Sequence, residues 1–206
     1  MDVSRIRSDT LQYHTMDLSE EKIIAFVGLP GSGKGTCTDY LHDTYNWPIV
    51  HFGKMVYEEV ERRGLDIVKD EAFVREDMRK QEGKDVLAKH ASRKVRQLIA
   101  EGNKTIVLDG LYSWTEYKYL ASEFGDSLIV IAIAAPKKLR HERTLKRKDA
   151  HRQYTLDQLI EREYREIENI EKGGPIAYAD YTVLNDSTPE DMTSRLTAIL
   201  KSEKVL

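Results

Sequence analysis

The sequence predicts an α/β domain built on a parallel sheet. Five short apolar runs lie at 22–27, 49–52, 105–108, 127–133 and 181–184. They lack alternation of apolar and polar residues, which is typical of strands covered on both faces. Segments with helical spacing separate the runs, and strands that alternate with helices favour a parallel sheet with right-handed crossovers. A glycine-rich turn follows the first run.

The helices are predicted between these strands. Gly102 stands where the C-terminal cap of one helix is expected, and Thr188-Pro189 is typical of the start of another. The predicted helices span 36–43, 54–63, 71–81, 85–101, 115–124, 137–146, 155–172 and 189–201.

Length and charge exclude several classes of protein. The 206 residues fit one domain, and 32 basic against 35 acidic residues give a net charge of −3. A globally basic nucleic-acid-binding surface is therefore excluded. The single cysteine, Cys37, excludes a disulfide framework and a thiolate zinc cluster, and it favours a reducing compartment. Cys37 itself is interpreted as a small residue that faces the core.

No segment indicates a membrane protein. The longest apolar run, 128–135, is too short to cross a bilayer. Residues 1–20 are polar, lack an apolar stretch of signal-peptide type, and are interpreted as an N-terminal extension. We therefore expect a cytoplasmic protein without a membrane or nucleic-acid partner.

The strongest motif is the turn from Gly28 to Thr36, which reads GLPGSGKGT. Backbone N–H groups of such a loop, with the N-terminus of the following helix, neutralise nucleotide phosphates. Glycines let the backbone approach the phosphates closely. In the strict motif a Ser or Thr follows the lysine directly, whereas Gly35 stands between Lys34 and Thr36 here. The predicted ATP-binding residues of the loop are Gly28, Pro30, Gly31, Ser32, Gly33, Lys34, Gly35 and Thr36.

This form of the loop resembles that of adenylate kinase and other nucleoside monophosphate kinase-like P-loop proteins. More closely, the chain resembles a dephospho-coenzyme A kinase-like subgroup. The resemblance covers about residues 22–201 and rests on the loop, Leu108-Asp109-Gly110 and the segments 51–64, 140–152, 161–166 and 179–185.

The resemblance implies a three-layer P-loop NTPase fold. Its five-stranded parallel sheet would have the order 2-3-1-4-5, with helices on both faces. The domain would span 21–206, after the extension 1–20. An acceptor-binding insertion would fall at about 53–84, and a short Arg-rich lid without zinc at about 146–154.

Asp109 is the predicted magnesium residue. It ends the third strand, and the ligand crevice of an open α/β sheet lies at the carboxyl ends of the strands. Magnesium keeps several waters and takes few protein ligands. We expect Asp109 and Thr36 to hold it largely through water. The alternative is an Asp that merely opens a turn before Gly110.

Four arginines are predicted to act with Lys34 and Asp109 in phosphoryl transfer. This chemistry depends on positioning and charge neutralisation, for which guanidinium groups are suited. Arg143 is expected to stack on adenine, and the other three to contact phosphates. The alternative is a solvated helix face carrying ion pairs. The four arginines are Arg143, Arg147, Arg162 and Arg165.

The acceptor side departs from the adenylate kinase pattern. Lys54 replaces its acidic residue, and Tyr57 replaces the arginine that binds the acceptor phosphate. Lys54, Arg62, Arg63 and Arg79 are the candidates for the missing positive charge. Tyr112 and Trp114 either line the acceptor pocket or cover the sheet edge. The predicted acceptor-binding residues are Gly53, Lys54, Tyr57, Arg79, Asp109, Gly110 and Tyr112.

Two functions remain open from the sequence. The first is an ATP- and magnesium-dependent kinase that acts on a nucleotide or a nucleotide-like small molecule, as a monomer or a homodimer. The second is a regulatory nucleotide-binding protein or slow NTPase without a small acceptor, which the missing acceptor arginine favours. The basic segment 137–152, with eight Lys or Arg against two acidic residues, favours the first.

Overall fold

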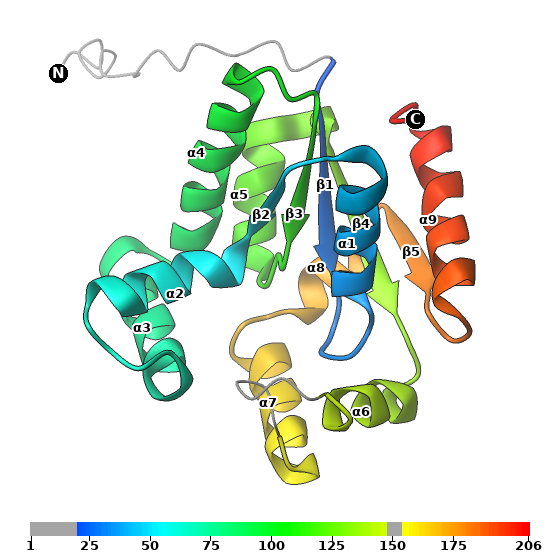
Figure 1. Ribbon diagram of the computed structural model, residues 1–206. Coiled ribbons are helices and arrows are strands. Elements are labelled where there is room, and N and C mark those ends of the chain that lie inside the picture. The colour runs from blue at the N-terminus through cyan, green and yellow to red at the C-terminus, as the bar shows by residue number, and fades with distance from the viewer. Residues whose placement is uncertain (1–19, 148–153) are drawn as a thin grey trace, which may run out of the picture.

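The computed structural model describes residues 20–147 and 154–206. Its sheet has the order β2-β3-β1-β4-β5, and each neighbouring pair is parallel, which confirms the predicted topology (Figure 1). The strands are β1 Lys22–Val27, β2 Ile49–His51, β3 Thr105–Asp109, β4 Leu128–Ala134 and β5 Tyr181–Leu184.

Every predicted helix is present in the structure. The α-helices are α1 Lys34–Tyr45, α2 Phe52–Arg62, α3 Ile67–Glu82, α4 Val86–Ala100, α5 Trp114–Phe124, α6 Lys137–Leu145, α7 Leu156–Glu168, α8 Gly173–Ala177 and α9 Pro189–Ser202. A 3₁₀ turn, η1 Gly125–Ser127, precedes β4.

One predicted helix ends earlier in the structure and is followed by a separate short helix. The sequence suggests one helix through residue 172, but α7 ends at Glu168 and the separate helix α8 follows. Glu171 adopts a left-handed backbone with φ 57°, which an α-helix cannot accommodate. The break places Lys172 in a connection instead of on the helix.

Helices cover both faces of the sheet, as the unbroken apolar strands require. On β1, Ile23 and Ala25 pack with α4 and α5, whereas Ile24 and Phe26 pack with α1 and α9. Cys37 of α1 lies in this second layer and is fully buried. Burial raises the pKa of its thiol to about 12, so Cys37 is a core residue, as predicted.

Helices α2 and α3 occupy most of the segment predicted as the acceptor-binding insertion, 53–84. A polar cluster joins them: Glu59 accepts hydrogen bonds from Arg62 at 2.6 Å and from Arg63 at 2.7 Å, and Arg63 also reaches Asp77 at 2.5 Å. Among the described residues, the ion pair between the end of α2 and α3 is therefore made by Arg63, beside the apolar packing of the two helices. Most of the predicted lid (148–153 of 146–154) and residues 1–19 of the predicted extension lie outside the described residues.

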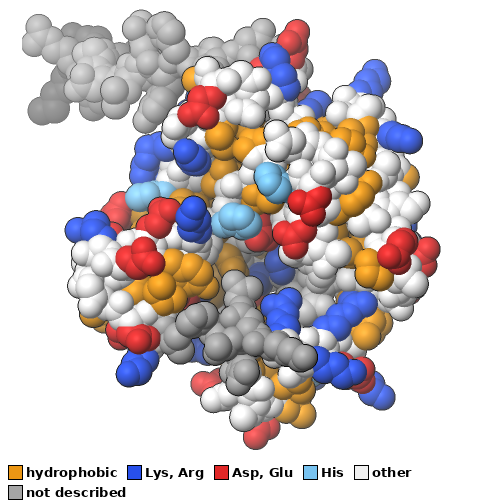
Figure 2. Space-filling model, in the orientation of Figure 1, with side chains coloured by type: hydrophobic (Ala, Val, Ile, Leu, Met, Phe, Trp, Pro, Cys, Tyr) orange, Lys and Arg blue, Asp and Glu red, His pale blue; other side chains and the backbone are white. Residues whose placement is uncertain are grey.

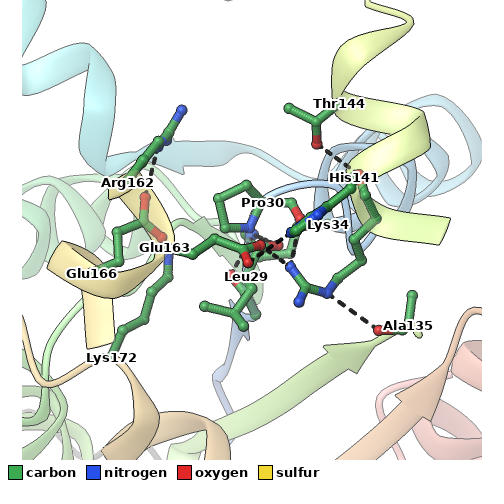
Figure 3. A network of polar contacts seen from close by, with 12 residues as sticks. Leu29, Pro30, Lys34, Ala135, His141, Thr144, Arg162, Glu163, Glu166 and Lys172 are labelled. Atoms are coloured by element: carbon green, nitrogen blue, oxygen red, sulfur yellow. Dashed lines mark hydrogen bonds and ion pairs between the residues drawn. The ribbon is translucent and has the colours of Figure 1, made fainter. Parts of the chain in front are cut away.

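A buried ion network joins the two helices that flank the predicted lid. Glu163 of α7 contacts both Arg140 and His141 of α6 (Figure 3). All three side chains are buried. Arg140 also donates to Pro30 O and Ala135 O, each at 3.2 Å. The network therefore ties α7 to α6 and to the loop after β1.

Within the described part of the chain, the helices are all too short or too polar to cross a bilayer.

The Glu163→Gln variant should lose stability. The amide keeps the shape of the carboxylate but leaves the buried Arg140 without its counter-charge, which costs about 3 kcal/mol. Urea unfolding at neutral pH measures the loss. The control is Glu161→Gln, an exposed position on the same helix, which should change the free energy of unfolding by less than about 0.5 kcal/mol. Equal unfolding midpoints for the two variants would contradict the role of the network.

The ion pairs of Glu59 with Arg62 and Arg63 should make the free energy of unfolding fall as the pH becomes acidic. Hydrogen bonds from Arg62 and Arg63 lower the pKa of Glu59 to about 2, below its unfolded value of about 4.5. The contribution of the Glu59 carboxylate to the free energy of unfolding is therefore complete at pH values above its unfolded pKa. It is lost as the pH falls toward the folded pKa of about 2. Because the pairs are surface pairs, we expect Glu59→Gln to cost about 1 kcal/mol at pH 7 and less at pH 3.

The control for this experiment is Glu58→Gln on the same helix. Glu58 is exposed and lies 4.0 Å from Lys54. Urea unfolding of both variants at the two pH values should show a pH-dependent loss for Glu59→Gln alone. A loss of the same size at both pH values would exclude the assigned titration.

Candidate functional site

The loop between β1 and α1 requires glycine at three points. Gly28, Gly31 and Gly33 have φ values of 148°, 75° and 107°. A Cβ on Gly31 would lie 2.3 Å from Arg140 O, and one on Gly33 would lie 2.2 Å from Asn185 Nδ2. Side chains larger than hydrogen cannot fit at these contacts. The loop is thus held closely between helix α6 and the end of β5.

Lys34 begins α1 and turns back over this loop. Its Nζ donates to Gly28 O at 2.7 Å. Burial, reinforced by the positive charge of Lys172, lowers the pKa of Lys34 to about 7, although Asp109 acts in the opposite direction. The ammonium group is therefore short of negative partners, and only carbonyl oxygens of its own loop accept its hydrogen bonds within the described residues.

Asp109 lies at the carboxyl end of β3, beside the end of β2. Its Oδ2 is 3.0 Å from His51 Nδ1, and its side chain is 26% exposed. Thr36 is exposed in the first turn of α1. A carboxylate and a hydroxyl are hard oxygen donors, which suit magnesium that keeps most of its waters. In the described residues no cluster of three or more His, Cys, Asp or Glu forms a dedicated metal cage.

The connection after α7 adds a second group of charges. Glu166 accepts from Arg162 Nε at 2.9 Å and from Lys172 Nζ at 2.6 Å. Lys172 is only 2% exposed, and burial lowers its pKa despite Glu166. The cations around Glu166 lower its pKa below the usual value, although its burial acts in the opposite direction. Two cations therefore share one carboxylate near Lys34 (Figure 3).

Tyr112 lies among cations of two different segments. Lys172 Nζ is 4.5 Å from the centre of its ring, and Arg75 Cζ of α3 is 5.3 Å from it. Arg75 also pairs with Glu71, while its buried Nε has no hydrogen-bond partner among the described residues. We call Arg75, Tyr112 and Lys172 the cationic cluster. Trp114, in contrast, stacks on Tyr117 and packs against Gly174. These contacts favour the interpretation that Trp114 covers the edge of the sheet.

The predicted arginines occupy different environments. Arg143 donates to Asn185 O and Oδ1, and Asn185 in turn donates to Ser32 O, so Arg143 supports the loop. Arg162 is half-buried beside Glu166, whereas Arg165 on the same helix is exposed. Arg147 is exposed just after α6. Basic side chains gather over the region of α6 (Figure 2).

The predicted acceptor residues are brought together only in part. Gly110 and Tyr112 follow Asp109 directly, and the Tyr112 ring packs on Gly110. Gly53 and Lys54 lie in the first turn of α2, where Lys54 is exposed and Tyr57 is half-buried. Arg79 pairs with the buried Glu116 at 3.0 Å.

Four residues that sequence reasoning missed also lie at this edge of the sheet. The structure adds His51, Arg75, Glu166 and Lys172. His51 and Glu166 belong to segments that carried the resemblance. Arg75 precedes Arg79 by one helical turn, so it shares a face with a residue already singled out. No comparable signal marked Lys172.

Comparison with known proteins gives the family. Residues 27–161 match a family described as AAA domain. The UPF0200 protein of Thermococcus onnurineus is 33% identical over 186 residues, which make up 89% of this chain and 98% of that protein. The UPF0200/UPF0201 protein of Archaeoglobus fulgidus is 35% identical over 182 residues, 88% of this chain. The chain spans 55% of that longer relative.

Solved structures show the same fold at low sequence identity. TT1252 from Thermus thermophilus is 18% identical with a TM-score of 0.61, and the match covers 89% of this chain and 98% of TT1252. Shikimate kinase from Aquifex aeolicus is 21% identical with a TM-score of 0.52, and the match covers 88% of this chain and 98% of the shikimate kinase. Fold, phosphate loop and identity to relatives agree, and the chain therefore belongs to the AAA-domain family of P-loop proteins and to the UPF0200 proteins.

Proposed function

We propose that the protein is an ATP- and magnesium-dependent phosphotransferase that acts on a nucleotide or a nucleotide-like small molecule. The observation that carries the proposal is the excess of buried positive charge at the mouth of the phosphate loop. Three cations, Lys34, Lys172 and Arg162, lie with two carboxylates, Asp109 and Glu166. Burial, reinforced by the charges of Lys172 and Arg162, lowers the pKa of Lys34. Such a cluster is stabilised when an anion binds. A polyphosphate supplies that charge.

Each residue has a role that its position suits. ATP with magnesium, when bound, supplies the phosphoryl group and part of the charge neutralisation. The loop backbone and Lys34 hold phosphate oxygens, and Asp109 with Thr36 holds the waters around magnesium. Arg162 supplies positive charge toward the transferred group. Arg143 keeps the loop in place through Asn185, and Arg147 and Arg165 are proposed to contact phosphates as the lid closes.

The molecule that accepts the phosphoryl group is less closely defined by the site than the phosphate donor. The resemblance to nucleoside monophosphate kinases and dephospho-coenzyme A kinases makes a nucleoside monophosphate and dephospho-coenzyme A the leading candidates. The cationic cluster supports an acceptor with an anionic group, because Arg75 and Lys172 offer the positive charge that Tyr57 lacks. One structural neighbour is a shikimate kinase solved in complex with shikimate, so a carboxylate-bearing acceptor belongs in the test as well.

The alternative is a regulatory nucleotide-binding protein or a slow NTPase. Tyr57 at the arginine position of the acceptor site favours it. The positive charge supplied from α3 and from the connection after α7 favours the phosphotransferase instead.

Transfer of labelled phosphate from ATP to a panel of acceptors tests the proposal. The panel holds nucleoside monophosphates, nucleosides, dephospho-coenzyme A and shikimate. We expect transfer to at least one of them and a loss of about 100-fold or more in kcat/KM for Lys34→Ala, because an interaction with transition-state charge is removed. The control is Lys94→Ala, an exposed position on α4.

The outcomes separate the two functions. ATP binding without transfer to any acceptor would exclude the phosphotransferase in favour of the alternative. Equal activity of the wild-type protein and Lys34→Ala would show that the loop assignment is wrong.

The Arg75→Gln variant tests the cationic cluster. We expect KM for the acceptor to rise about tenfold, because a charge-assisted contact worth about 1.5 kcal/mol is lost, while the Kd for ATP stays unchanged. Steady-state kinetics and calorimetric ATP titration measure the two effects. Arg93→Gln, at an exposed position on α4, is the control. An unchanged acceptor KM would remove Arg75 from the acceptor site.

A further inference from the structure

A pocket lies between α3, the start of α5 and the connection from α7 to α8. Its volume is about 280 Å³, close to the lower end of the range for small-molecule sites. Arg79, Lys80 and Lys84 line it from the α3 side, Ser113 and Thr115 from α5, and Asn169 from the connection. The phosphate loop and the three residues of the cationic cluster do not line it. The pocket is thus distinct from the phosphate loop and from the cationic cluster, and it places Arg79, one of the acceptor-binding residues predicted from sequence, away from both.

The pocket contains one firmly held cation. The Arg79 side chain is only 9% exposed and is fixed by Glu116, which lies 3.0 Å away and is fully buried. Glu76 is a weaker partner at 3.4 Å. Arg79 Nε is buried and has no hydrogen-bond partner in the described part of the chain. A buried N–H without an acceptor costs free energy, so a site with a spare donor favours an acceptor-rich ligand.

The remaining walls also favour a negative ligand. Lys80 and Lys84 are exposed at the rim, and neither forms an ion pair with the described residues, although Glu76 and Glu171 also line the pocket. Ser113 caps α5, and the N–H of Glu116 donates to its Oγ. The N–H groups of Trp114 and Thr115, earlier in the same turn, have no acceptor inside the helix. The partial positive charge of this helix end adds to the charges of Lys80 and Lys84. The carboxylate of Glu116, which accepts from the N–H groups of Tyr112 and Ser113, offsets the charge of Arg79.

The pocket adjoins the cationic cluster along three segments. Ser113 follows Tyr112, Glu171 precedes Lys172, and Arg79 lies one turn after Arg75 on α3. A ligand in the pocket would therefore contact the insertion helix and the connection after α7 at once. It would link two segments that also carry the proposed acceptor site.

We propose that this pocket binds the phosphate group of a small phosphorylated molecule. Arg79 supplies the fixed contact, Lys80 and Lys84 supply mobile charge at the rim, and the start of α5 supplies backbone donors. This site is additional to the phosphate loop and does not depend on the phosphotransferase proposal.

Titration of the full ¹⁵N-labelled chain with inorganic phosphate, at constant ionic strength, tests the proposal. NMR separates the two sites, because the amides of Trp114 and Thr115 report the pocket while those of Gly31–Thr36 report the phosphate loop. We expect saturable shifts at both. The double variant Lys80→Gln/Lys84→Gln should raise the Kd at the pocket about tenfold and leave the loop unchanged.

Two controls make the result decisive. Arg93→Gln/Lys94→Gln removes the same charge from exposed positions on α4 and should leave the Kd at the pocket unchanged. Lys34→Ala should weaken the shifts of the loop alone. Phosphate shifts confined to the loop would overturn the proposal, and so would equal weakening at the pocket in both double variants. Failure of the phosphotransferase assay would leave this result standing.

Discussion

The close packing of the phosphate loop determines how the elements around it are arranged. Gly31 lies so near Arg140 O, and Gly33 so near Asn185, that no other residue fits at either place. The loop conformation therefore fixes helix α6 and the end of β5 relative to β1. Arg140 then extends the constraint to α7 through Glu163. Loop, α6 and α7 form one connected unit, and the segment between the two helices is where the resemblance expects the lid.

The same unit concentrates charge at the carboxyl edge of the sheet. All five strands end there, and each leads into a part of the site or of its support. The phosphate loop follows β1, His51 ends β2 and Asp109 ends β3. The chain after β4 leads to Arg140, and Asn185 follows β5. Parallel strands bring these ends to one edge, which is why an α/β sheet binds ligands there. The buried ammonium groups of Lys34 and Lys172 lie in this edge with few carboxylates. Burial, reinforced by neighbouring cations, lowers the pKa values of both lysines.

On the proposed acceptor side, positive charge lies at other positions than in the adenylate kinase pattern. Where the adenylate kinase pattern has an arginine, this chain has Tyr57 on α2. Positive charge reaches the neighbourhood instead from Arg75 on α3 and from Lys172 after α7, both beside Tyr112. Among the residues considered from sequence, Arg62 and Arg63 bind Glu59 and so serve the link between α2 and α3.

The sheet, its helices and the phosphate loop could all be predicted from the amino-acid sequence. Unbroken apolar runs must be buried on both faces, and the glycines of the loop have a local conformational cause, so both can be inferred from neighbouring residues alone. The partners of the charged side chains, in contrast, became known only from the folded arrangement. Whether Arg75 or Arg79 meets Tyr112, and whether Lys172 lies on a helix or beside Glu166, depends on how α3 and the connection after α7 pack on the sheet. The long, flexible side chains of arginine and lysine reach partners far apart in the chain, and sequence spacing does not encode those distances.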